Sequence, residues 1–254
     1  MTLVLAAVAL VLVLGIAVMT ARGGGGGPQG GVTWGPLDAS EIEDRIREGL
    51  GGGPEDPDPA LLHLARYHAF DMAARDFDGP VNPEGEDLAT RRSRIAPTYV
   101  GTASQSQQLF RRDAGTREAE IAKKALAGLG GVGPEAIVGV AVEGGRVAVV
   151  VLEGRRVATL DAAPMTDLVA GDFEQEGHMV PGLSPDGLTA IWEHEGADVP
   201  AGPTQFKGED LPDDPEEVAL PFVLEVPVPE GETRLVLRLE HAGTPVYRAT
   251  IRTG

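Results

Sequence analysis

The feature that most constrains this chain is an apolar run at its N-terminus. Residues 3–19 contain only apolar side chains and glycine, and about 17 residues are needed for a helix to cross the hydrocarbon core of a bilayer. A helix that is apolar on every side suits lipid better than a half-buried position in a soluble core. We therefore expect residues 1–21 to be a transmembrane anchor or a signal peptide.

The flanks of this run favour an uncleaved anchor over a signal peptide. No Lys or Arg precedes it, and a cleavage after Ala21 would place Met19 where a small residue is preferred. The one nearby basic residue, Arg22, follows the span and by itself favours an inward-facing chain. The domain types described below favour the outside instead. We expect a protein that is anchored on the extracytoplasmic side or secreted, with a flexible Gly-rich linker over residues 22–36.

Composition excludes several classes of function. The chain has no cysteine, which excludes disulfides, thiolate metal sites and a cysteine nucleophile. Residues 161–254 hold 5 basic and 19 acidic residues, so most of the net charge of −18 lies there. Binding to nucleic acid needs a Lys/Arg footprint, and we therefore expect no nucleic-acid partner.

Residues 37–161 are predicted to form a first domain with helices before a final hairpin. Ser40 is expected to cap a first helix, and Asp58-Pro59 to begin a second. A third helix is predicted over residues 118–129, and two strands around a Glu-Gly-Gly turn over residues 138–152. The second helix has the clearest apolar face, formed by Leu61, Leu64, Ala65, His68, Met72 and Ala73.

Residues 61–87 follow a known pattern, Leu-x-x-x-Ala-x-x-His-Ala-x-Asp-Met-Ala and then a Phe- and Pro-x-Gly-containing loop. This pattern resembles the second-helix region of the CAP superfamily, which comprises the cysteine-rich secretory, antigen 5 and pathogenesis-related 1 proteins and their bacterial relatives. Residues 138–142 and 146–152 resemble the last two strands of that family. The resemblance implies an α-β-α sandwich that is secreted or displayed on the cell envelope. The matching residues are Leu61, Ala65, His68, Ala69, Asp71, Met72, Ala73, Phe77 and Pro83-Glu84-Gly85.

The departures from the family bear on its chemistry. The cavity of the family typically holds two histidines and two glutamates and sometimes a divalent metal. Here the loop histidine falls on Pro80, the Gly-Glu-Asn-Ile segment falls near residues 101–104 without its glutamate, and residues 128–135 contain no second histidine. The resemblance therefore implies that the cavity chemistry is lost. We assign no catalytic, cofactor-binding or metal-binding residue, and His68 is the candidate cavity residue, or else a packed core histidine.

Two other groups resemble metal sites in composition. Glu174, Glu176 and His178 would share one face of a strand, although a solvated face explains the same spacing. His194 lies between two glutamates. Residues 82–86 have the alternate oxygens of a calcium loop without its glycine and glutamate in place, and we predict a turn there.

Residues 162–254 are predicted to form a second, all-β domain. Strands are expected over residues 173–180, 188–195, 222–228, 235–240 and 246–252, with turn signals between them. That spacing is typical of a small immunoglobulin-like sandwich. Residues 196–217, rich in Asp, Pro and Gly, are predicted to be a loop outside the core.

The sequence thus predicts an α+β protein: a CAP-like α-β-α sandwich, a small immunoglobulin-like sandwich and an N-terminal transmembrane helix. We expect a non-catalytic envelope-associated or secreted protein that acts as a binding or structural module. Its expected partners are the membrane, through the N-terminal segment, and an unknown protein or small apolar ligand. The alternatives are a divergent hydrolase or metal-dependent enzyme with a relocated site, or a carrier of an apolar ligand.

Overall fold

The computed structural model describes residues 37–253 except 114, 165–166, 169–171, 185–186, 195–196, 204, 207–217 and 228–234. Contacts divide the chain into two compact units, Met1–Gly35 and Pro36–Gly254, and all described residues belong to the second. The expected anchor and linker, residues 1–21 and 22–36, lie outside the described residues. Among the helices that are described, none has the length and apolar character to cross a membrane.

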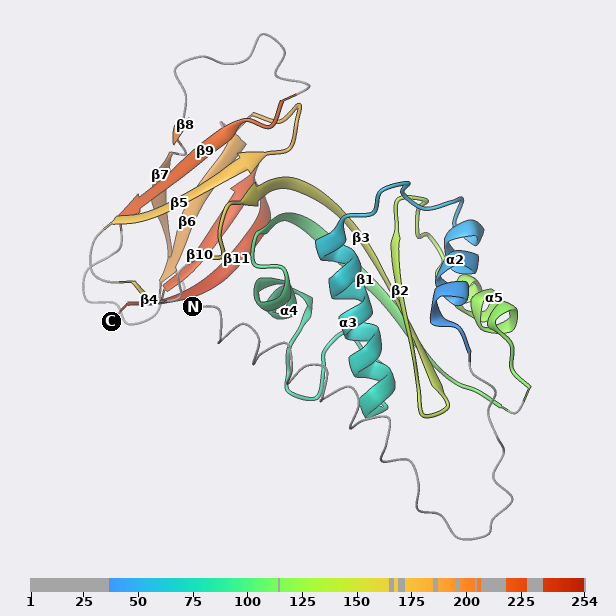
Figure 1. Cartoon of the computed structure of the whole chain (residues 1–254). Coiled ribbons are helices and arrows are strands. Elements are labelled where there is room, and N and C mark those ends of the chain that lie inside the picture. The colour runs from blue at the N-terminus through green and yellow to red at the C-terminus, as the bar shows by residue number, and fades with distance from the viewer. Residues whose placement is uncertain are drawn as a thin grey trace, which may run out of the picture. The chain divides into compact units, whose positions relative to one another are not determined.

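The described chain combines helices with mostly antiparallel sheets, so its fold class is α+β (Figure 1). Helix α2 spans Ala39–Gly49, and its cap is Asp38 rather than the predicted Ser40. The Asp38 carboxylate accepts from the backbone N–H of Ser40 and of Glu41, and it also accepts from the Ser40 hydroxyl. Both residue types cap helices well, and here the hydroxyl of Ser40 is itself bound to Asp38.

The predicted second helix is confirmed as α3, Pro59–Arg75, with Asp58 as its cap and proline in its first turn. All six residues of its predicted apolar face are buried. The predicted third helix is confirmed as α5, Glu118–Gly128. Between them lies a short helix that the sequence did not predict, α4, Leu88–Ile95, capped by Asp87.

The first sheet is organised around one long strand. The predicted hairpin is confirmed as β2, Ile137–Glu143, and β3, Arg146–Leu160, but β3 continues eight residues past the predicted end at Leu152. Strand β1, Tyr99–Arg111, pairs with β3 along its whole length. The sheet has six strands in the order β1-β3-β5-β9-β8, with β2 also paired to β3.

Helices cover both faces of the β1-β3-β2 part of this sheet (Figure 1). Side chains alternate between faces along a strand. Val147, Val149 and Val151 of β3 therefore pack in one core with α2 and α5. Their neighbours Ala148, Val150 and Leu152 pack in a second core with α3.

All five strands predicted after residue 161 are confirmed. They are β5 (Asp172–Met179), β6 (Leu188–His194), β9 (Pro221–Pro227), β10 (Leu235–His241) and β11 (Thr244–Thr253).

The prediction of a loop over residues 196–217 is wrong for its first part. Strand β7, Ala197–Pro203, pairs with β6, and the two-residue β8, Gln205–Phe206, pairs with β9. Prolines are tolerated at a sheet edge, where one side of the backbone needs no partner, and β7 is the edge of its sheet. That sheet has five strands in the order β4-β11-β10-β6-β7, where β4 is Asp167–Leu168.

A third core lies between strands of the two sheets. Phe173 of β5 and Trp192 of β6 meet edge to face, with 6.1 Å between their ring centroids. Val157, Ala158 and Leu160 from the end of β3 belong to the same core, and β3 pairs there with β5. The predicted boundary between residues 161 and 162 thus falls directly after the end of β3, where that strand already pairs with β5.

Candidate functional site

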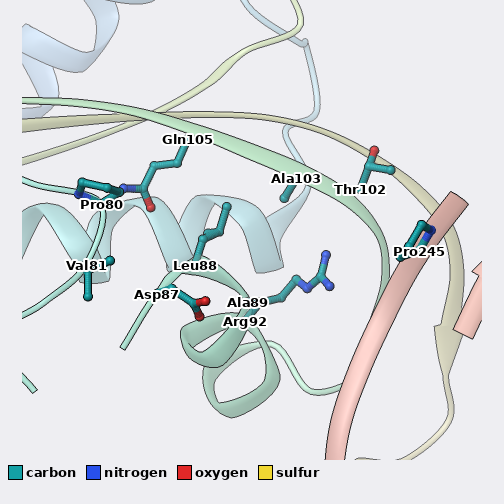
Figure 2. Close-up of a pocket in the computed structure, with 10 residues that line it drawn as sticks. All are labelled: Pro80, Val81, Asp87, Leu88, Ala89, Arg92, Thr102, Ala103, Gln105 and Pro245. Atoms are coloured by element: carbon teal, nitrogen blue, oxygen red, sulfur yellow. The ribbon is translucent and has the colours of Figure 1, made fainter. Parts of the chain in front are cut away.

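A pocket of about 600 Å³ opens beside α4 and is called the α4 pocket here (Figure 2). Three segments that are distant in sequence supply its walls: the α3–α4 loop together with α4, the first half of β1, and the start of β11. Its volume lies in the range of small-molecule sites. The lining residues are Pro80, Val81, Asp87, Leu88, Ala89, Arg92, Thr102, Ala103, Gln105 and Pro245.

Arg91 holds one wall of this pocket in place. Its side chain is fully buried, and the guanidinium donates to the carbonyl oxygens of Glu86 at 2.6 Å and Pro80 at 2.9 Å. It also donates to Oε1 of Gln105 on β1 at 2.8 Å. Burial lowers the pKa of Arg91, but arginine keeps its charge in proteins. One cation therefore ties the loop between α3 and α4 to the first sheet.

The loop is also braced internally. The Asn82 side chain donates to Glu86 Oε2 at 2.9 Å and accepts from the Glu86 backbone N–H at 2.8 Å. Gly85 has a φ of 86°, a conformation that favours glycine, and its N–H donates to the Asn82 carbonyl. The predicted turn over residues 82–86 is confirmed. The Glu86 carboxylate also forms an ion pair with Arg94 at 2.9 Å.

His68 lies behind this wall and is not among the residues that line the pocket. Its side chain is fully buried, as predicted, with Nε2 3.0 Å from the Gly79 carbonyl oxygen and its ring 5.7 Å from that of Phe77. Burial first, and the charge of Arg91 second, lower the pKa of His68 to about 4. At neutral pH the imidazole is therefore uncharged and donates to Gly79 from Nε2.

Two of the three segments compared above with the CAP pattern supply residues to the pocket. Pro80 lines it together with Thr102 and Ala103 of β1. These residues bring apolar surface and one hydroxyl to the pocket. The Thr102 Oγ1 accepts from the Arg155 backbone N–H at 3.3 Å.

Two charged groups line the pocket, and sequence reasoning missed both. Asp87 caps α4 by accepting from the Thr90 N–H at 2.8 Å, and the hydrogen bonds of Thr90 lower the pKa of Asp87. Arg92 Nη1 donates to the Gly101 carbonyl oxygen at 2.6 Å, and burial lowers the pKa of Arg92. Every side chain of the segment 90–94 is polar, so no local signal distinguishes Arg92 from its neighbours.

The lining carries neither imidazole nor thiol, and its one carboxylate is committed to a helix cap. Throughout the described ranges, no group of three or more His, Asp or Glu side chains is placed to hold a metal ion. The lining is mainly apolar, and an apolar pocket of this volume is suited to holding a small molecule.

The other predicted metal-like groups lie on strand faces away from the cores. Glu174 and His178 of β5 are exposed, while Gln175 and Gly177 between them are buried, and His178 Nδ1 is 2.8 Å from Asp161 Oδ1. Glu193 forms ion pairs with Arg238 at 3.0 Å and Arg248 at 2.6 Å. The side chain of His194 lies outside the described residues.

Comparison with protein-family models and with curated proteins found no match to this sequence.

Proposed function

We propose that this protein is a non-catalytic binding module of the cell envelope, in which residues 37–161 form a degenerate CAP-like domain that holds a small, mainly apolar ligand in the α4 pocket. The single observation that carries this proposal is the lining of the pocket. Apolar side chains dominate it where the CAP pattern would place a histidine and a glutamate. Binding of an apolar ligand to such a surface is favourable, because it removes apolar area from water.

The order of the elements supports the CAP-like part of the proposal. Among the described residues, helices α2, α3 and α4 precede β1, and α5 separates β1 from the β2–β3 hairpin. Helices pack on both faces of these strands. This is the three-layer arrangement that the resemblance of residues 61–87 implies. The strands from β5 onward are then an appended immunoglobulin-like sandwich that acts as a spacer or a second binding surface.

The location is proposed from the N-terminal sequence. An apolar run over residues 3–19 followed by a Gly-rich linker would tether the folded part to a membrane, on the extracytoplasmic side, or direct its secretion. A protein partner is compatible with the same architecture. The enzyme alternative has less support, because His68 is fully buried beside Gly79 and Phe77 and does not line the pocket.

A matched pair of helix variants tests the binding proposal. Ala89 of α4 lines the pocket and is exposed, and Ala119 of α5 is exposed on another helix. The full-length chain in phosphatidylcholine nanodiscs is titrated with 1-octanol by calorimetry, with empty nanodiscs as the blank. We expect Ala89→Trp to abolish saturable binding and Ala119→Trp to leave it unchanged. Equal binding by both variants, or none by the native chain, would contradict the proposal.

A hydrolysis assay tests the non-catalytic part. The same samples are incubated with 4-nitrophenyl octanoate, with and without calcium or zinc. We expect the rate to equal that of empty nanodiscs. A rate above this background that disappears in Ala89→Trp would establish an enzyme and overturn the proposal.

A further inference from the structure

No carboxylate partners Arg92 among the described residues, in contrast to several other arginines of this acidic protein. Arg66 pairs with Glu43 at 2.6 Å, and Arg156 pairs with Asp58 at 2.7 Å. Arg92 has a hydrogen bond to the Gly101 carbonyl, and the groups that favour its charge electrostatically are the phenols of Tyr99 and Tyr247. The chain has 39 acidic residues against 21 basic ones, yet none of the described acids reaches this guanidinium.

The position of Arg92 in the α4 pocket would allow a ligand to supply the carboxylate that the chain does not. Its side chain extends along the α4 pocket toward the end formed by Thr102 and Pro245 (Figure 2). A guanidinium has five N–H donors, and the bond to Gly101 accounts for one of the two on Nη1. A partly buried cation with spare donors binds most strongly to an oxyanion, because a carboxylate can accept two parallel hydrogen bonds from it.

The rest of the lining sets the shape of such a ligand. Pro80, Val81 and Leu88 supply apolar surface, and Val81 is 47% exposed. A second anionic group would meet Asp87, whose carboxylate is kept ionised by the helix cap. The lining therefore fits one anionic head and one apolar body.

We propose that the α4 pocket selects small amphipathic monocarboxylates, with the carboxylate paired to Arg92 and the aliphatic part against Pro80, Val81 and Leu88. This inference rests on the proposed binding function and adds the chemical class of the ligand. The negative charge of the whole protein disfavours anions in general. Selectivity for a carboxylate must then arise locally, from Arg92.

Three isosteric probes separate the ligand class from binding as such. Octanoate, 1-octanol and octylammonium share one chain length and differ in the charge of the head. They are titrated into the full-length chain in phosphatidylcholine nanodiscs, against empty nanodiscs. We expect octanoate to bind about tenfold more tightly than octanol, which is the scale of a charge-assisted hydrogen bond, and octylammonium to bind most weakly.

Variants of Arg92 assign the preference to one side chain. Arg92→Met should lower the affinity for octanoate to that for octanol and leave octanol binding unchanged, whereas Arg92→Lys should keep part of the preference. Lys123→Met, on α5, removes one positive charge elsewhere and should change nothing. Octanol binding unchanged by Arg92→Met also shows that the variant is folded.

Each other outcome is decisive. Equal affinity for octanoate and octanol in the native chain overturns the carboxylate inference and leaves the binding function standing. A preference for octylammonium places recognition at Asp87 and also overturns it. If Arg92→Met keeps the preference for octanoate, that preference arises from a group other than Arg92, which overturns the inference. No saturable binding of any probe overturns both proposals.

Discussion

The guanidinium of Arg91 donates to the carbonyl oxygen of Pro80 at 2.9 Å, across the loop that connects α3 to α4. With its bonds to Glu86 and Gln105, this contact ties the loop that forms one wall of the α4 pocket to β1. Arg92, the next residue along the chain, lines this pocket. Adjacent arginines thus have separate roles, one structural and one proposed for recognition.

Replacing Arg91 should loosen the pocket and destabilise the fold. Arg91→Met leaves the three acceptors without their donor, and we expect the free energy of unfolding to fall by about 3 kcal/mol. Arg91→Lys should restore little, because one ammonium cannot reach three acceptors in the planar geometry of a guanidinium. Denaturant unfolding measures the loss. Arg94→Met, which removes an exposed ion pair with Glu86, should cost less than about 1 kcal/mol, and equal losses for both would contradict this account.

The burial of His68 should make stability depend on pH. Its pKa is lowered to about 4 from an ordinary value of 6.5, so between these values the unfolded chain binds more protons than the folded one. The stability from this group is fully present above pH ~6.5 and is lost as the pH falls toward ~4, by roughly 3 kcal/mol.

The variant His68→Phe removes the titrating group and keeps a ring in the same space. Unfolding free energies measured from pH 7 to pH 4 should decline less steeply in this variant than in the native chain. His63 lies exposed on the same helix, and His63→Asn should preserve the native slope. Parallel slopes for His68→Phe and the native chain would show that His68 does not cause the dependence.

Glu43 connects α2 to the unpaired edge of β2. Its carboxylate accepts from the Val140 backbone N–H at 2.9 Å and from Arg66 at 3.0 and 2.6 Å. Glu43→Ala should cost about 2 kcal/mol, because a buried N–H loses its acceptor. Hydrogen exchange of the Val140 amide should accelerate in this variant, while Glu48→Ala, at an exposed position of the same helix, should leave it unchanged.

Gly139 permits the close approach of α3 to β2. A Cβ at this position would lie 2.5 Å from the carbonyl carbon of Ala65 and from the backbone nitrogen of Arg66. Gly139→Ala should therefore push the helix from the sheet and lower the free energy of unfolding by about 2 kcal/mol or more. Gly130→Ala is the control, because a Cβ on Gly130 would meet no atom within 4 Å, and thermal unfolding compares the two.

The parts of the fold that could be predicted are those that local chemistry determines. The start of α3 follows from Asp58 and Pro59, which are adjacent in sequence, and its buried face follows from helical spacing alone. The β2–β3 turn follows from Gly144 and Gly145, whose positive φ angles suit glycine. The end of β3 depends instead on pairing with β1 and β5, which no local pattern records. Strand β7 pairs with its neighbour β6, but its prolines concealed it in the sequence.

The candidate site was predictable only in part for the same reason. The expected resemblance to the CAP pattern drew attention to Pro80, but the pocket needs three separate segments to form. Arg91 and Arg92 lie in a polar stretch that is typical of an exposed segment, and the burial of Arg91 depends on carbonyl oxygens from a loop and an amide from β1. The sequence alone does not show which basic side chains will form an ion pair with a carboxylate in the folded chain.

The alternation of β3 between two cores makes its alignment hard to mistake during folding. If the strand shifted by one residue against β1, every side chain from Val147 to Leu152 would change faces. Val147, Val149 and Val151 would then crowd α3, while Ala148 would leave a void beneath α2 and α5. Both cores would be penalised at once, and so would the end of β3 that pairs with β5. Strand β3 contributes side chains to all three cores, so its register determines the packing of each. A folding intermediate with a shifted β3 would be poorly packed in all three cores and therefore unstable.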